Sequence, residues 1–129
     1  MITGGECSHG PNRHAIDMGM YKDPVLAIHS GRVETTTTDQ YGGKYILLDH
    51  GDGYCSLYLH LESFSVSPGK RIQQGEIIGI SGNTGKGGKY HLHLAVTRKV
   101  NGRCSASQSQ EVRMIFDESL MDHWLTKIR

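Results

Sequence analysis

The chain has 129 residues, with 14 lysines and arginines against 13 aspartates and glutamates, a net charge of +1, 17 glycines and three cysteines. This length fits one domain over residues 1–129, which can bury a core without a disulfide framework. The charge is balanced, so the sequence lacks the basic patch that is typical of nucleic-acid binding. The apolar runs are far shorter than the roughly 20 residues of a membrane span. We therefore expect a soluble domain that binds no nucleic acid and has no membrane span. We also expect a monomer.

The N-terminal residues Met1 to Gly5 lack the basic start and the apolar stretch of a signal peptide. The protein is therefore expected either to stay inside the cell or to lack its targeting segment in this sequence. Cys7, Cys55 and Cys104 are too widely spaced for a CxxC metal site or a disulfide scaffold. At most one pair of cysteines can form a bridge.

Short apolar segments between glycine-rich turns predict an all-β fold. The strands are expected at residues 14–18, 25–28, 32–38, 44–50, 54–60, 76–80, 91–98 and 112–116. The fourth and fifth form a hairpin through Gly51-Asp52-Gly53, because its glycines supply the positive φ that a short turn needs. Another turn is expected at residues 67–70. An apolar stripe behind Asp117 predicts a C-terminal helix over residues 117–129.

Alternation along the strands predicts which side chains share a face. In the segment from His91 to Leu94 the period of two places His91 and His93 on one face and the leucines on the other. The same rule places Asp17 on the side of Ala15 and directs His14 to the opposite side. One strand thus offers two imidazoles, and another offers a carboxylate.

The strand at residues 54–60 ends in a third histidine. Alternation groups Tyr54, Ser56, Tyr58 and His60 on one face, opposite an apolar face. We therefore expect a polar surface lined by aromatic rings that leads to His60.

Three histidines and one aspartate of this kind suit a catalytic zinc site. Such a site needs three nitrogen or oxygen ligands, a fourth position for water and a nearby base. The HxH spacing alone is weak evidence, because a single histidine is usually a surface or hydrogen-bonded residue. That structural interpretation is kept for His29, His50 and His123.

Several short motifs occur in a fixed order along the chain. They are Ala15-Ile16-Asp17, Val25 to Val33, Tyr58-Leu59-His60-Leu61, Ser67 to Gly79, Ser81-Gly82-Asn83-Thr84-Gly85 and His91-Leu92-His93-Leu94. From about Gly4 to about Phe116 this series resembles the lysostaphin-type zinc metallopeptidases. The resemblance implies an antiparallel β-sandwich-like fold of the duplicated-hybrid-motif type, with one zinc ion per chain. It also implies hydrolysis of peptide bonds in the stem peptides or cross-bridges of bacterial peptidoglycan, outside the cytoplasm.

The resemblance also assigns roles to individual residues. Asp17 and His93 match zinc ligands, whereas His60 and His91 match histidines that flank the metal without binding it. The usual position of the first ligand holds Arg13, whose guanidinium cannot ligate zinc. His9 and His14 are the two candidates for that ligand. Strand parity turns His14 away from Asp17, so His9 is favoured.

The implied mechanism follows from charge. A zinc ion held by two imidazoles and one carboxylate lowers the pKa of its water towards ~7. His60 and His91 would deprotonate or orient that water, stabilise the oxyanion and protonate the leaving amine. Candidate walls of the substrate groove, listed together, are Tyr54, Tyr58, Asn83 and Tyr90.

Four alternatives have specific arguments for or against them. The glycine-rich segment 82–88 resembles a phosphate loop but lacks the spacing of one, and we expect a mobile loop beside the groove. Cys7 could close a structural zinc site, which would remove the open position. A module resembling lipoyl or biotinyl carrier domains would need a lysine at a hairpin tip. A module resembling sugar-phosphotransferase carriers would not need Asp17. A degenerate relative that binds cell wall or activates an amidase would usually have lost ligands.

Overall fold

The computed structural model describes residues 2–3, 15–86, 89–107 and 110–112. In this part of the chain every strand pairing is antiparallel. The strands in chain order are β1 (Ile2–Thr3), β2 (Ile16–Gly19), β3 (Pro24–Leu26), β4 (Gly31–Asp39), β5 (Gly43–Asp49), β6 (Tyr54–Phe64), β7 (Arg71–Ile72), β8 (Ile77–Ser81), β9 (His91–Arg98) and β10 (Glu111–Val112).

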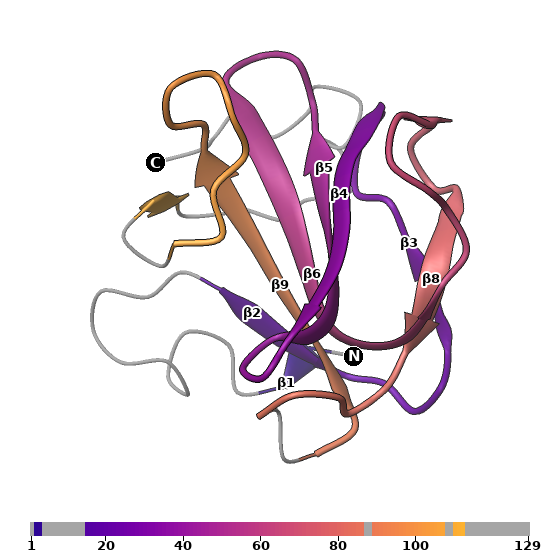
Figure 1. The fold of residues 1–129 in the computed structure, drawn as a ribbon. Helices are drawn as coiled ribbons and strands as arrows, with labels where there is room; N and C mark the ends of the chain where they lie inside the picture. Colours follow the sequence, from indigo (N-terminus) through magenta and orange to yellow (C-terminus); the bar gives the residue numbers. More distant parts are fainter. Residues whose placement is uncertain (1, 4–14, 87–88, 108–109, 113–129) are drawn as a thin grey trace.

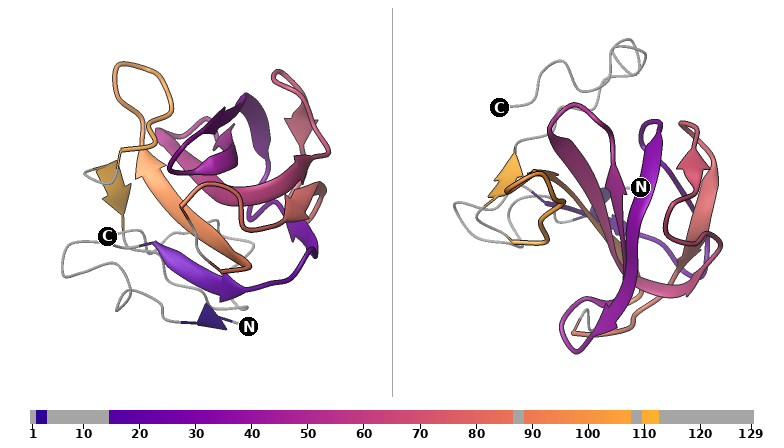
Figure 2. Two further views of the ribbon diagram at one scale, coloured as in Figure 1. Left: turned by 60° about the horizontal axis from the view of Figure 1, so that its bottom comes forward. Right: turned by 45° about the horizontal axis from the view of Figure 1, so that its top comes forward.

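The strands form one curled sheet in the order β1-β2-β9-β6-β5-β4-β7 (Figure 1). Strand β6 belongs to two parts of this sheet, because its first half pairs with β5 and β9 and its end pairs with β8. Strand β8 in turn pairs with β3. These two strands extend the sheet from the end of β6 and lie beside β4 (Figure 2). Strand β10 adds to β9 beyond the part that pairs with β2.

The core has two clusters, one on each face of the central strands. The larger cluster contains Leu92, Leu94 and Val96 of β9 together with side chains from β3, β5 and β8. The smaller cluster lies on the other face and contains Ala15, Leu47, Leu57 and Ala95. Burying one aliphatic side chain contributes roughly 1.5–3 kcal/mol. The larger cluster therefore dominates stability, and the face with the smaller one has room for a polar site.

The predicted all-β class is confirmed, as are most of the predicted strands. The hairpin between β5 and β6 turns through Gly51 and Gly53, which have φ values of 83° and 92°. Gly69, with φ 94°, forms the second predicted turn. Strands β1 and β7 were not predicted, because two-residue strands carry no periodic signal. The predicted helix at 117–129 lies outside the described residues. Among the described residues no helix has the length and apolarity needed to span a membrane.

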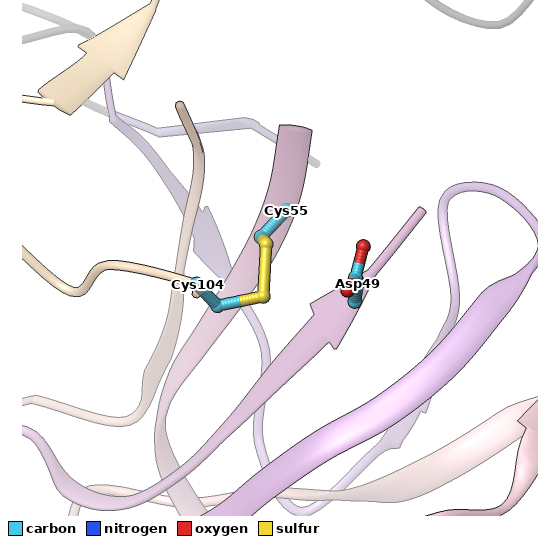
Figure 3. Close-up of side chains that lie close together, drawn as sticks. All are labelled: Asp49, Cys55 and Cys104. Carbon is cyan, nitrogen blue, oxygen red and sulfur yellow. A yellow bond between two sulfur atoms is a disulfide. The ribbon is translucent and has the colours of Figure 1, made fainter. Parts of the chain in front are cut away.

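A disulfide joins Cys55 of β6 to Cys104, which follows β9 (Figure 3). Cys55 is fully buried, and the backbone N–H of Cys104 donates to the Glu34 carboxylate at 3.0 Å. Asp49 lies beside the two sulfurs, but its carboxylate accepts from Lys99 Nζ at 2.7 Å. Because the sulfurs are bonded to each other, we interpret this group as a structural crosslink rather than as a metal site.

Candidate active site

The predicted aspartate and the predicted histidine ligand meet on neighbouring strands. Asp17 of β2 lies directly opposite His93 of β9 in the antiparallel register. Residues opposite each other point to the same face, and Asp17 Oδ1 lies 3.4 Å from His93 Nδ1. The same oxygen lies 3.8 Å from His91 Nε2 and is shielded from solvent. The parity predicted for Asp17, His91 and His93 is confirmed.

His60 reaches this group through an irregularity that strand alternation does not predict. The register between β5 and β6 shifts so that Lys44 pairs with Leu61 whereas Ile46 pairs with Tyr58, which leaves one extra residue in β6. His60 lies in this bulge with φ 65°, a left-handed conformation that is rare for residues other than glycine. The bulge turns its ring towards β9, where the ring centroid lies 4.9 Å from that of His91 and 6.0 Å from that of His93.

Backbone carbonyls fix the orientation of both flanking histidines. His60 Nδ1 donates to Thr84 O, and His91 Nδ1 donates to Lys89 O, each at 2.8 Å. A carbonyl oxygen can only accept, so the hydrogen of each neutral ring is on Nδ1. Nε2 is therefore the basic nitrogen of both rings. Burial is the main cause that lowers the pKa of His60, and the neighbouring His91 and His93 lower it further. The neutral form of His60 is thus favoured near pH 7.

Thr84 holds the loop that carries this carbonyl. Its hydroxyl donates to Leu61 O at 2.6 Å and accepts from the backbone N–H of Lys44 at 3.0 Å. A side chain at Gly43 would collide with Thr84, and one at Gly85 would collide with the backbone of Gly43. The described part of the segment predicted to be a mobile loop, residues 82–86, is therefore packed against the turn before β5.

The predicted groove residues do not lie together. Tyr58 is fully buried, its hydroxyl accepts from Ile28 N, and burial raises its pKa to about 12. It therefore cannot line a groove, and the expected aromatic surface along β6 is not present. Tyr54 lies opposite Arg98, at the far end of β9 from His91 and roughly 23 Å away along the strand. Asn83 is exposed next to Thr84.

Tyr90 is the predicted groove residue that lies next to the site. The centroid of its ring lies 4.5 Å from the centroid of the Tyr21 ring, just beyond the paired ends of β2 and β9. Both rings are exposed. Sequence reasoning missed Tyr21, because its segment carries no strand alternation that would direct its side chain.

Sequence reasoning also missed Glu111 and the role of Thr84. The Glu111 side chain is 2 % exposed, and its Oε2 lies 4.0 Å from His93 Nε2. The predicted strand began one residue later, at residue 112, so no pattern indicated Glu111. Thr84 is part of the Ser81 to Gly85 motif, which was a signal for the segment but not for this residue.

The donor atoms fit a zinc ion. Asp17 Oδ1, a carboxylate oxygen shielded from solvent, lies 3.4 Å from the imidazole nitrogen His93 Nδ1 on the neighbouring strand. Zinc prefers ligand atoms of these types. His9 and His14, the candidates for the third ligand, lie outside the described residues, as do Cys7 and His123. A separate hollow of about 460 Å³ contains none of the site residues. It is lined by Gly31, Arg32, Val33, Glu34, Asp49, His50, Gly51, Gly69 and Arg71.

Comparison with known proteins agrees with this geometry. Residues 12–107 match peptidase family M23. The chain belongs to this family. It is 40 % identical over 102 residues to the peptidoglycan DD-endopeptidase ShyA of Vibrio cholerae, an alignment that covers 79 % of this chain and 23 % of ShyA. This M23 chain thus spans about a quarter of that relative's length.

Two solved peptidase structures have the same fold. The catalytic domain of the antimicrobial peptidase lysostaphin from Staphylococcus simulans superposes with a TM-score of 0.69 at 29 % identity, over 84 % of this chain and 78 % of that one. A zinc-containing peptidase from Vibrio cholerae superposes with a TM-score of 0.62 at 30 % identity, over 66 % of this chain and 26 % of that one. The resemblance to lysostaphin-type peptidases is confirmed, and membership of this family implies a metal.

Proposed function

We propose that this chain is a zinc-dependent endopeptidase that hydrolyses peptide bonds in the stem peptides or cross-bridges of bacterial peptidoglycan. The observation that carries the proposal is the convergence of Asp17, His93, His91 and His60 on one sheet face. Two of these residues come from adjacent strands in register, and His60 comes from a backbone irregularity that turns it towards the others. Strained conformations of this kind concentrate at functional sites.

Asp17 Oδ1 and His93 Nδ1 would hold the zinc ion, with a third ligand from His9 or, as the alternative, His14. When bound, zinc acts as a Lewis acid that activates water and polarises the scissile carbonyl. The preference for His9 rests on strand parity. Ala15 belongs to the smaller core cluster, on the face to which Asp17 also points. If alternation continued one residue further, it would direct His14 to the opposite face.

His60 and His91 would carry out proton transfer. Each ring is anchored through Nδ1 to a backbone carbonyl, which leaves Nε2 to accept a proton and to return it to the leaving amine. A protonated Nε2 also donates to a developing oxyanion. The exposed rings of Tyr21 and Tyr90, which lie against each other, would contact an extended peptide.

We infer that the protein acts outside the cytoplasm. The disulfide between Cys55 and Cys104 supports this location, because such bridges persist in oxidising compartments and are rare in the cytosol. The similarity to ShyA, a peptidoglycan DD-endopeptidase, agrees with this location.

One experiment tests the proposed function. Metal content of the purified chain is measured together with turnover of purified peptidoglycan fragments, one set with direct cross-links and one with glycine bridges. We expect one zinc per chain, hydrolysis of at least one set and loss of hydrolysis after chelation. Fragment binding without hydrolysis, in the zinc-loaded chain, would instead identify a degenerate wall-binding or amidase-activating relative. Full activity of a metal-free preparation would contradict the proposal.

A further inference from the structure

Glu111 is a buried carboxylate on the same sheet face as the candidate zinc ligands. In the register of β10 with β9, Glu111 lies opposite Thr97 and Val112 lies opposite Val96. Val112 belongs to the larger core cluster, so Glu111 points to the other face, which carries His93 and Ala95. Ala95 lies between His93 and Thr97 on that face. Its short side chain leaves room for the longer side chains of Glu111 and His93 to approach each other.

The two ring nitrogens of His93 face different carboxylates. Nδ1 lies 3.4 Å from Asp17 Oδ1, and Nε2 lies 4.0 Å from Glu111 Oε2. A neutral imidazole carries its hydrogen on one nitrogen, and only the other nitrogen has a lone pair for a metal. Asp17 alone would favour the hydrogen on Nδ1, which is the nitrogen that the metal needs. A negative charge at Glu111 favours the hydrogen on Nε2 and so opposes this effect.

We propose that Glu111 is a positioning residue that keeps the hydrogen of His93 on Nε2 and thereby presents the Nδ1 lone pair to the metal. This inference rests on the proposed function only in assigning His93 as a ligand. Carboxylates beside the second nitrogen of a metal-binding histidine fix its tautomer and ring orientation, and their loss typically weakens metal binding 10- to 100-fold. The side chain of Glu111 is almost completely buried, which restricts its movement and suits this role.

The test measures zinc affinity without substrate. Glu111→Gln keeps the size of the side chain and removes its charge, Glu111→Ala removes both, and Glu62→Gln is the control, because Glu62 is a solvent-exposed carboxylate. Zinc dissociation constants are measured by competition with a chromophoric chelator. We expect about 10-fold weaker binding for Glu111→Gln, up to about 100-fold for Glu111→Ala and no change for Glu62→Gln.

A second measurement separates positioning from a merely structural role. Nitrogen-15 NMR of the metal-free protein reports which nitrogen of His93 carries the hydrogen, and we expect Glu111→Gln to shift the population from Nε2–H towards Nδ1–H. A lower unfolding temperature with unchanged zinc affinity and unchanged tautomer would overturn the inference and leave the proposed function intact. Conversely, if Glu111→Gln weakens zinc binding and shifts the tautomer while the zinc-loaded wild-type chain hydrolyses neither fragment set, the inference is supported and the proposed function is contradicted.

Discussion

His50 lies on one side of β6, and His60 and His91 lie on the other. They differ in how their ring nitrogens are used. On the side of the larger core cluster, His50 Nδ1 donates to Ser30 O at 2.7 Å, and His50 Nε2 lies 2.8 Å from Ser56 Oγ. On the other side, His60 and His91 each bind a backbone carbonyl through Nδ1. Within the described residues, neither Nε2 atom of these two has a hydrogen-bond partner.

The use of the ring nitrogens distinguishes a structural histidine from a catalytic one. His50 is part of a buried network that continues from Ser56 to the Tyr58 hydroxyl, and both of its nitrogens are needed to satisfy that network. Burial is the main cause that lowers its pKa to about 4. His60 and His91 keep Nε2 for chemistry, and His91 Nε2 lies 3.8 Å from the shielded oxygen of Asp17.

The largest effect is expected from the ligands on the site face. Asp17→Ala and His93→Ala remove donors that adjacent strands hold in register, so we expect loss of bound zinc and of hydrolysis. Metal analysis and fragment turnover are the measurements. His50→Gln serves as the control histidine and should keep its metal. Loss of zinc in His50→Gln, with retention in His93→Ala, would reverse the comparison.

The flanking histidines should separate catalysis from metal binding. We expect His60→Ala and His91→Ala to reduce turnover by about 10²–10⁴-fold while zinc stays bound, because both act in proton transfer. Zinc stoichiometry of each variant is the deciding measurement. If His91→Ala empties the site, the assignment of ligand and catalytic residue within the HxH pair is reversed.

Removal of the disulfide tests whether the stability of the fold and the binding of the metal depend on each other. It closes a loop of 49 residues, and its removal in the Cys55→Ala and Cys104→Ala double variant should cost about 4 kcal/mol of unfolding free energy in the loop-entropy description. Denaturant unfolding measures this cost. Zinc affinity of the folded variant should match that of the wild type, and a parallel loss of zinc binding would show that the bridge helps to form the site.

His50 should make the stability of the protein depend on pH. Its pKa is about 4 in the folded state against 6.5 when unfolded, so between these values the unfolded chain binds a proton that the folded chain does not. The free energy of unfolding should therefore fall by about 3 kcal/mol as the pH drops from 6.5 to 4. Unfolding of wild type and His50→Gln across this range measures the effect. Equal slopes in the two proteins would contradict it.

The smallest expected effect concerns the third ligand. Because parity directs His14 away from Asp17, His9→Ala should weaken zinc binding at least 10-fold, whereas His14→Ala should reduce stability and keep the metal. Zinc dissociation constants of the two variants decide between them. A site that survives His9→Ala and is lost in His14→Ala would mean that the chain between His14 and Asp17 does not follow strand alternation.

The local features of this protein follow from its amino-acid sequence alone. Alternation in β9 places His91 and His93 on one face, and alternation in β2 places Asp17 on the side of Ala15; both hold in the structure because a regular strand has a fixed period of two. The hairpin at Gly51 and Gly53 was equally predictable, because those glycines supply the backbone conformations that the turn requires. The ordered motifs also indicated the family.

The way in which distant segments complete the site depends on the tertiary structure. Alternation grouped His60 with Tyr58, yet the bulge between β5 and β6 separates them and sends Tyr58 into the core and His60 towards His91. A bulge depends on the pairing of two strands, so neither strand alone predicts it. The approach of Glu111 to His93 likewise depends on the register of β10 against β9. Such contacts are set by packing between segments, which a periodicity within one segment does not contain.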